Sequence, residues 1–116
     1  MSEKDPKKPI AERQALPQRR HSINFTEMFW GQPWHITCGF YADHVSVGEV
    51  FVNAARTPGT DLDAMARDGA ILFSLALQYG IPLDVIRGAL TRNPAGGPST
   101  IVGLIADRIA NIGPKI

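Results

Sequence analysis

The stretch ILFSLALQYGIPLDVIRGAL, residues 71–90 of this 116-residue chain, decides the fold that the sequence predicts. Gly80 is typical of the position just past the end of a helix. Pro82 is favoured at the first position of a helix, because its missing N–H costs nothing there. The stretch therefore predicts two helices joined at a Gly-Ile-Pro corner. The first helix has almost no polar face, so it needs apolar neighbours on more than one side.

The first of these helices is predicted to begin after Thr60, a good N-cap residue. Asp61 and Asp63 follow in the first turn, where the helix dipole favours negative charge. Gly69 predicts a close contact with a neighbouring element. The apolar residues at helical spacing are expected to face a sheet, and they are Leu62, Met65, Ala66, Ile71, Leu72, Leu75, Ala76 and Tyr79.

Three further residues of this helix are candidates for packing or dimerisation: Phe73, Leu77 and Tyr79. Phe73 and Leu77 lie off the stripe assigned to the sheet, so they need a second apolar cover. Either the later helices or a two-fold mate could provide it. We expect a homodimer on this ground.

Upstream of residue 60, apolar and polar residues alternate with the period of two that is typical of strands. Three such runs cover residues 21–31, 32–43 and 47–55, with a turn predicted at 31–33 and a loop through Asp43, His44 and Ser46. One face of the second run carries Trp34, Ile36, Cys38 and Phe40. Short connections of this kind favour an antiparallel meander.

Downstream of the corner, the sequence predicts a helix over 82–92, a loop at NPAGGPS (93–99) and a last helix capped by Ser99 and ended by Gly113-Pro114. The predicted fold is therefore α+β: a three-stranded antiparallel β-meander followed by three helices, the first helix packed on the sheet. Residues 19–113 are expected to form this single domain. Residues 1–18, basic and rich in proline, are expected to be a disordered tail.

The composition is that of an ordinary soluble domain, with 44% hydrophobic and 20% charged residues. The formal net charge of +1 provides no overall field for nucleic acid or membrane. Cys38 is the single cysteine, which excludes a disulfide within the chain and favours a reducing compartment. We find neither an apolar run of the ~18 residues that a membrane span needs nor a secretory signal. The expected location is cytoplasmic.

No group of residues has the spacing of a self-sufficient active site. His35 and Cys38 are three apart, so in a strand they face opposite sides and do not converge on a metal. Asp61 and Asp63 are explained by the helix N-terminus, which leaves Asp68 and His44 without an assigned acid or base role. The residues alone therefore predict no catalytic, cofactor-binding or metal-ligating side chain.

Aromatic and basic residues offer one candidate binding surface, for a nucleotide or single-stranded nucleic acid. It comprises Arg19, Arg20, Trp30, Trp34, Tyr41 and Arg56. The competing interpretation makes the aromatic residues core of a small sheet. The near-neutral charge favours that second interpretation.

Several ordered blocks resemble the C-terminal region of adenosylcobalamin-dependent (class II) ribonucleotide reductases, a region called the TSCPD domain that also occurs as short stand-alone proteins. The blocks lie within residues 19–92: Arg19-Arg20, Gly48-Glu49-Val50-Phe51-Val52, Gly59-Thr60 and the run SLALQYGIPL at 74–83. The resemblance implies a relative of ribonucleoside-diphosphate reductase.

The chain also departs from that family. It is too short for the catalytic barrel that holds the radical chemistry and the adenosylcobalamin, and with one cysteine it has no redox cysteine pair. The Cys-Pro-Asp element that names the domain is missing, since NPAGGPSTIVGLIAD follows Arg92. The resemblance therefore implies neither catalysis nor a cofactor for this chain alone.

Three functions remain open at this point. The first is a non-catalytic accessory or interaction module in deoxyribonucleotide metabolism, whose partner is a ribonucleotide reductase or another nucleotide-metabolism protein. The second is the nucleotide or single-stranded nucleic-acid binding module described above. The third is a split-off subunit that completes a reductase in trans.

Overall fold

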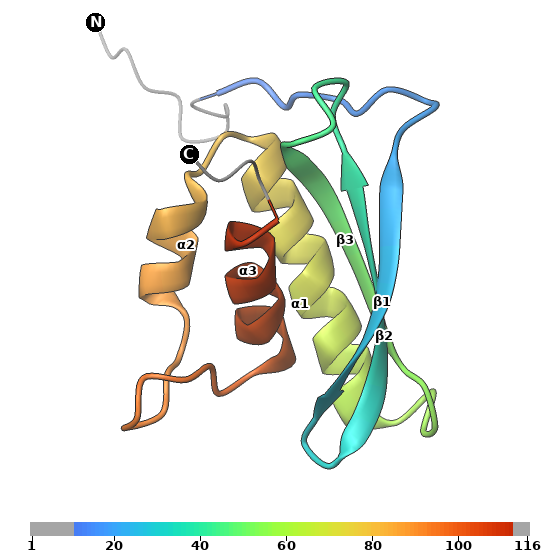
Figure 1. Ribbon diagram of the computed structural model, residues 1–116, viewed down its shortest axis with the longest axis vertical. Helices are drawn as coiled ribbons and strands as arrows, with labels where there is room; N and C mark the ends of the chain where they lie inside the picture. Colours follow the sequence, from blue (N-terminus) through green and yellow to red (C-terminus); the bar gives the residue numbers. More distant parts are fainter. Residues whose placement is uncertain (1–10, 113–116) are drawn as a thin grey trace, which may run out of the picture.

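The computed structural model describes residues 11–112 and contains three strands followed by three helices (Figure 1). The elements are β1 (Ser22–Phe29), β2 (Gln32–Phe40), β3 (Val47–Ala54), α1 (Asp61–Gln78), α2 (Leu83–Ala89) and α3 (Ile101–Ala110). The strands form one antiparallel sheet in the order β1-β2-β3, and α1 packs beside β3. The predicted α+β meander with three helices is confirmed.

The turn between β1 and β2 lies one residue earlier than predicted. Trp30 and Gly31 have φ angles of 51° and 74°, as a two-residue type I′ turn requires, and Phe29 pairs with Gln32 across it. Gln32 and Pro33, which the sequence placed in the turn, belong to β2. The sequence favoured a turn at Pro33, because proline is common in turns and a tryptophan in the left-handed region is uncommon.

The alternation in the strands separates a buried face from an exposed one, as predicted. The buried face of β2 and β3 meets α1 and α3 in one core, made of Trp34, Ile36, Cys38, Phe40, Val47, Val50, Val52, Ala54, Ala66, Ala70, Phe73, Ile101, Leu104, Ile105, Ala106 and Ile109. The other face carries exposed Asn24, Thr26, His35 and Phe51. Helix α2 lies farther out and packs on α3 (Figure 1).

Both ends of α1 follow the prediction. The Thr60 side chain accepts the N–H of Asp63 at 3.1 Å. At the other end Gly80 has a φ of 86°, and the N–H groups of Gly80 and Ile81 bind the carbonyls of Leu77 and Ala76. These two bonds form a Schellman motif that closes the helix, so the Gly-Ile-Pro corner is a helix stop followed at once by a helix start.

The face that α1 turns to the sheet differs from the prediction. Its buried residues are Asp63, Ala66, Ala70, Phe73, Ser74 and Gln78, while Leu62, Met65, Ile71 and Leu72 are exposed. Phe73 is therefore a core residue and not a surplus surface residue, and Leu77 is half-buried against the core. The apolar surplus exists, but on the other side of the helix.

The later helices are shorter than predicted. Helix α2 ends at Ala89, because Leu90 is extended and Arg92 forms a bridge with Pro98. Thr100, not Ser99, caps α3 by accepting the N–H of Gly103 at 3.1 Å. The close contact predicted at Gly69 is present, since a Cβ there would lie 2.9 Å from Val102 Cγ2 of α3.

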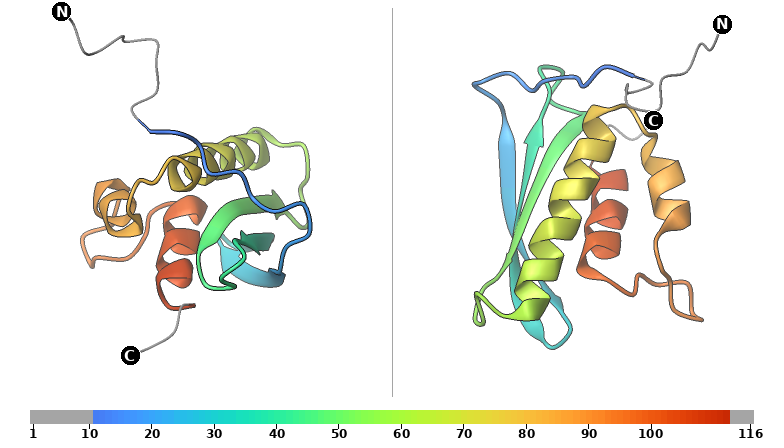
Figure 2. Two further views of the ribbon diagram at one scale, coloured as in Figure 1. Left: turned by 90° about the horizontal axis from the view of Figure 1, so that it is seen from above. Right: turned by 180° about the vertical axis from the view of Figure 1, so that it is seen from behind.

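The segment 11–20 runs across one end of the domain before β1 begins (Figure 2). Within it the N–H of Gln14 binds the carbonyl of Gln78 at 2.8 Å. The Gln14 carbonyl accepts the Tyr41 hydroxyl at 2.7 Å. The tail predicted over 1–18 thus falls in two parts. Residues 1–10 lie outside the described residues, and residues 11–18 are bound to the domain.

Candidate functional site

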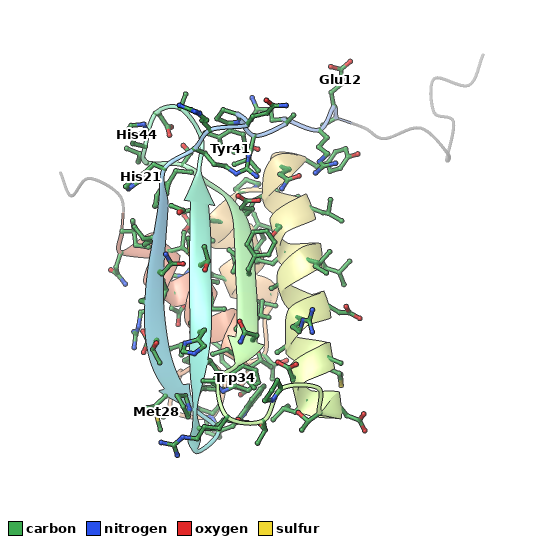
Figure 3. All side chains as sticks on the ribbon, turned by 90° about the vertical axis from the view of Figure 1, so that its right-hand side faces the viewer. Glu12, His21, Met28, Trp34, Tyr41 and His44 are labelled. Carbon is green, nitrogen blue, oxygen red and sulfur yellow. The ribbon has the colours of Figure 1, made fainter. Side chains whose placement is uncertain are left out.

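The six residues of the predicted binding surface do not come together. Trp30 and Trp34 lie at the end of the sheet where β1 turns into β2, whereas Tyr41 lies at the opposite end (Figure 3). Near Tyr41, Arg20 is paired with Glu49 and donates to the carbonyl of Pro17. A stacking platform needs aromatic faces and cations side by side, so this structure does not form one from these residues.

Trp34 is also buried, which removes it from any surface. Its exposed fraction is 0%, and its indole N–H donates to the Phe29 carbonyl at 2.9 Å. The ring of Trp30 lies edge-on to it with centroids 5.7 Å apart and is partly exposed. The interpretation of Trp34 as core is the correct one. Arg19 and Arg56 are both exposed.

Three buried polar residues of α1 bind the free edge of β3, and we call this contact the α1–β3 seam. Asp63 Oδ1 accepts the N–H of Ala54 at 2.7 Å, and its Oδ2 accepts that of Gly59 at 3.0 Å. Ser74 Oγ accepts the N–H of Val50 at 2.8 Å. Gln78 donates to the Gly48 carbonyl at 2.8 Å. The seam satisfies backbone groups that an edge strand otherwise leaves unpaired.

The hydrogen bonds of the seam also set the ionisation of Asp63. The backbone N–H groups of Ala54 and Gly59 lower the pKa of this carboxyl, and they outweigh the opposite effect of its burial. Sequence reasoning assigned Asp63 to the helix dipole and missed its role in the seam. A signal was present, because Ser74 and Gln78 are four residues apart and share one helical face.

The segment 11–20 joins the same end of the seam, which we call the Gln78 junction. Arg13 donates to the side-chain oxygen of Gln78 at 2.5 Å while Gln78 itself binds β3. Gly48 is required there, because a Cβ would come 2.5 Å from the Tyr41 ring. The junction thus connects the N-terminal segment, the end of α1 and the start of β3.

An apolar groove opens on the opposite side of α1, and we call it the α1 groove. It has a volume of about 600 Å³. Its walls come from α1, α2 and α3, and include Leu62, Met65, Leu72, Ile86, Leu90 and Val102. Trp30 of the turn between β1 and β2 also lines the groove. The groove is lined almost wholly by hydrocarbon, so it suits an apolar surface and not a polar metabolite.

Ion pairs hold the outer elements in place. Asp107 of α3 binds Arg92 at 2.8 Å and Arg87 of α2 at 3.0 Å. The hydrogen bond from Arg92 is the main reason why the pKa of Asp107 falls to about 2. Arg108 of α3 pairs with Glu27 of β1. Glu27, which interrupts the apolar face of β1, is thereby explained.

Cys38 lies in the core, where burial raises the pKa of its thiol to about 11. A neutral buried thiol is a poor nucleophile and a poor metal ligand. His35 is on the exposed face of the same strand, as the period of two predicts.

Within residues 11–112 no three His, Cys, Asp or Glu side chains group as a metal site would require. None of the described helices is long and apolar enough to cross a membrane.

Comparison with known protein families identifies the family of this chain. The model of the TSCPD domain matches residues 5–112, nearly the whole chain. The chain belongs to the TSCPD domain family. The resemblance drawn from the motif blocks is therefore confirmed, although the Cys-Pro-Asp element of the name is absent here.

Similar curated proteins are vitamin B12-dependent ribonucleotide reductases. That of Bradyrhizobium diazoefficiens is 34% identical over 82 residues, which are 71% of this chain and 6% of the reductase. That of Agrobacterium fabrum is 34% identical over 80 residues, 69% of this chain and 6% of the reductase. That of Rhodopirellula baltica is 37% identical over 74 residues, 64% and 7% of the two chains. No solved structure matches.

In this TSCPD domain the motif blocks of the resemblance meet at the seam and the junction. Glu49 of the Gly48–Val52 block binds Arg20 of the Arg-Arg pair. Ser74 and Gln78 of the SLALQYGIPL run bind β3 within that block. The motifs of this TSCPD domain are thus engaged in holding its own elements together. Glu49, Ser74 and Gln78 also line a small cleft of about 170 Å³.

Proposed function

We propose that this TSCPD domain is a non-catalytic accessory module of deoxyribonucleotide metabolism that binds the catalytic chain of a ribonucleotide reductase. The observation that carries the proposal is the use of the motif residues. Arg20, Glu49, Ser74 and Gln78 are occupied by contacts within the domain. A domain whose shared residues preserve its shape serves best as a rigid binding unit.

The kinship with reductases supports the choice of partner. Each of the three reductases contains a segment that matches this chain, and that segment is 6–7% of its length. In those proteins the segment is covalently joined to the rest of the reductase. We infer that the partner of this chain is the catalytic chain of such a reductase.

The state of Cys38 supports a role without catalysis. Thiol and disulfide chemistry in proteins needs an accessible thiolate, and this thiol is buried with a pKa of about 11. In this proposal adenosylcobalamin and the reaction both belong to the catalytic chain. This domain contributes binding, for instance by holding the catalytic chain in one conformation.

The test uses the reductase of Agrobacterium fabrum in two forms, intact and with the segment matched by this chain deleted. Isothermal titration with the full chain is expected to show binding to the deleted form, and weaker binding to the intact form, whose own segment occupies the site. Absence of binding to both forms would refute the proposal.

Turnover of ribonucleotide by the same mixtures separates the accessory role from the third function considered above. We expect the turnover of the deleted form to be changed only modestly by the chain. If an inactive deleted form regained full turnover, the chain would be a completing subunit, and the accessory role would be wrong.

A further inference from the structure

Helix α1 carries an apolar stripe on the side that faces away from β3. Its positions alternate by three and four residues, the spacing of a coiled-coil seam. They are Leu62, Met65, Gly69, Leu72, Ala76 and Tyr79. Met65 and Leu72 are 75% and 68% exposed, and Leu62 and Tyr79 are exposed by more than a third. This much hydrocarbon on an 18-residue helix is typical of an interface and not of free surface.

Residue sizes along the stripe are complementary to those of its own reversed copy. When two α1 helices run antiparallel with the stripes in contact, Leu72 of one faces Gly69 of the other. In the same register Met65 faces Ala76. At these central positions each large side chain meets a small one, which favours a short helix separation, while Leu62 faces Tyr79 at the two ends. We propose that a second copy of this chain covers the stripe, with the two α1 helices antiparallel.

The α1 groove lies beside the stripe. Gly69 and Val102 of α3 both line it and are in close contact, since a Cβ at Gly69 would lie 2.9 Å from Val102 Cγ2. A knob of the second copy would therefore rest on both residues. Ile86 of α2 and Leu90, just past the end of that helix, also line the groove, so a helix lying in it would contact α2 as well. Figure 1 shows α2 and α1 on either side of α3, which leaves this side of α1 without a covering element.

Charge is compatible with a second copy. Asp68 flanks the stripe one helical turn from both Met65 and Leu72. In this register Asp68 lies opposite residues 73–75 of the second copy and not opposite the second Asp68. The symmetric contact therefore places no like charges directly against each other.

This interface replaces the one expected from the sequence, which relied on Phe73 and Leu77. Phe73 is in the core and Leu77 is packed against it, so neither is available to a partner. The inference concerns the chain by itself and does not depend on the proposed binding to a reductase.

Sedimentation equilibrium of the full chain tests the interface without any reductase present. We expect twice the chain mass of 12.6 kDa at micromolar concentration. Leu72→Glu is expected to weaken the dimer on the order of 100-fold, because a carboxylate would be buried without a partner. Phe51→Glu, a matched change of an exposed residue on the far face of the sheet, is expected to leave the dimer intact. Circular dichroism confirms that each variant is folded.

Disulfide trapping tests the register. The variant carrying both Met65→Cys and Ala76→Cys is expected to form cross-linked dimers on oxidation, since these positions face each other. Met65→Cys alone is expected to form none. A monomeric wild-type chain, or a dimer that Leu72→Glu does not weaken, would overturn the proposal. Efficient cross-linking by Met65→Cys alone would overturn the antiparallel register.

Discussion

The hydroxyl of Ser74 occupies both hydrogen-bonding groups of the Val50 backbone. It accepts the Val50 N–H at 2.8 Å and lies 3.1 Å from the Val50 carbonyl, with the Ala70 carbonyl at 2.8 Å as a second acceptor for its proton. One side chain on a helix thus substitutes for a missing neighbouring strand. With Asp63 and Gln78 it makes α1 the cover of a sheet edge that would otherwise be open to pairing with other chains.

Ser74→Ala is expected to destabilise the domain by about 1–3 kcal/mol, because the buried N–H and carbonyl of Val50 lose their partner. Urea unfolding followed by circular dichroism measures the effect. Thr37→Ala is the control, since Thr37 donates to Asn24 on the exposed face of the sheet. A surface change of that kind is expected to cost less than about 0.5 kcal/mol. Equal losses for the two variants would contradict the role assigned to the seam.

Gln78→Ala is expected to release the segment 11–18 from the domain. The substitution removes the acceptor of Arg13 and the donor to Gly48. Limited trypsin digestion measures this, because cleavage after Arg13 requires the segment to leave the surface. We expect faster cleavage there than in the wild-type chain. Asn53→Ala, a change on the exposed face of β3, is the matched control and is expected to leave the rate unchanged.

The order of elements could be predicted because it depends on local signals. The change from a period of two to a period of 3.6, with Thr60, Gly80 and Pro82 as markers, places all six elements. The orientation of α1 could not be predicted in this way. Its buried face includes Asp63, Ser74 and Gln78, which are polar, while its exposed face carries Met65 and Leu72. A rule that turns apolar residues inward therefore chooses the wrong side.

The residues of the predicted binding surface do not come together, for a related reason. Trp30, Trp34, Arg20 and Tyr41 are chemically suited to bind a base, but whether they converge depends on strand register. The antiparallel pairing of β1 with β2 sends the tryptophans to one end and Tyr41 to the other. The binding of segment 11–18 to the domain also could not be predicted from composition, because its hydrogen bonds go to Gln78 and Tyr41, which are distant in the sequence.

The Cys38 thiol is expected to be almost unreactive in the folded chain. Burial raises its pKa to about 11, so at pH 8 the thiolate is scarce and also shielded. Reaction with a chromogenic disulfide reagent is expected to be at least about 100-fold slower than in denaturant. Phe51→Cys supplies an internal standard, because position 51 is exposed on the face of the sheet away from the helices. A rate for Cys38 that matches the rate in denaturant would contradict its place in the core.

The pairing of Asp107 is expected to determine part of the acid sensitivity. Its pKa falls to about 2 in the folded chain, chiefly through the hydrogen bond from Arg92, against about 3.9 for an unfolded aspartate. Because the folded value is the lower one, the pairing stabilises the fold above pH 4, and that contribution disappears as the pH falls towards 2. Asp107→Asn is therefore expected to be less stable than the wild type at pH 6 and nearly equal to it at pH 2.

Asp84→Asn provides the control, since the Asp84 side chain is exposed and its nearest approach to Arg87 is 4.0 Å. A stability difference for Asp107→Asn that stayed constant from pH 6 to pH 2 would show that the ionised pair is not its cause.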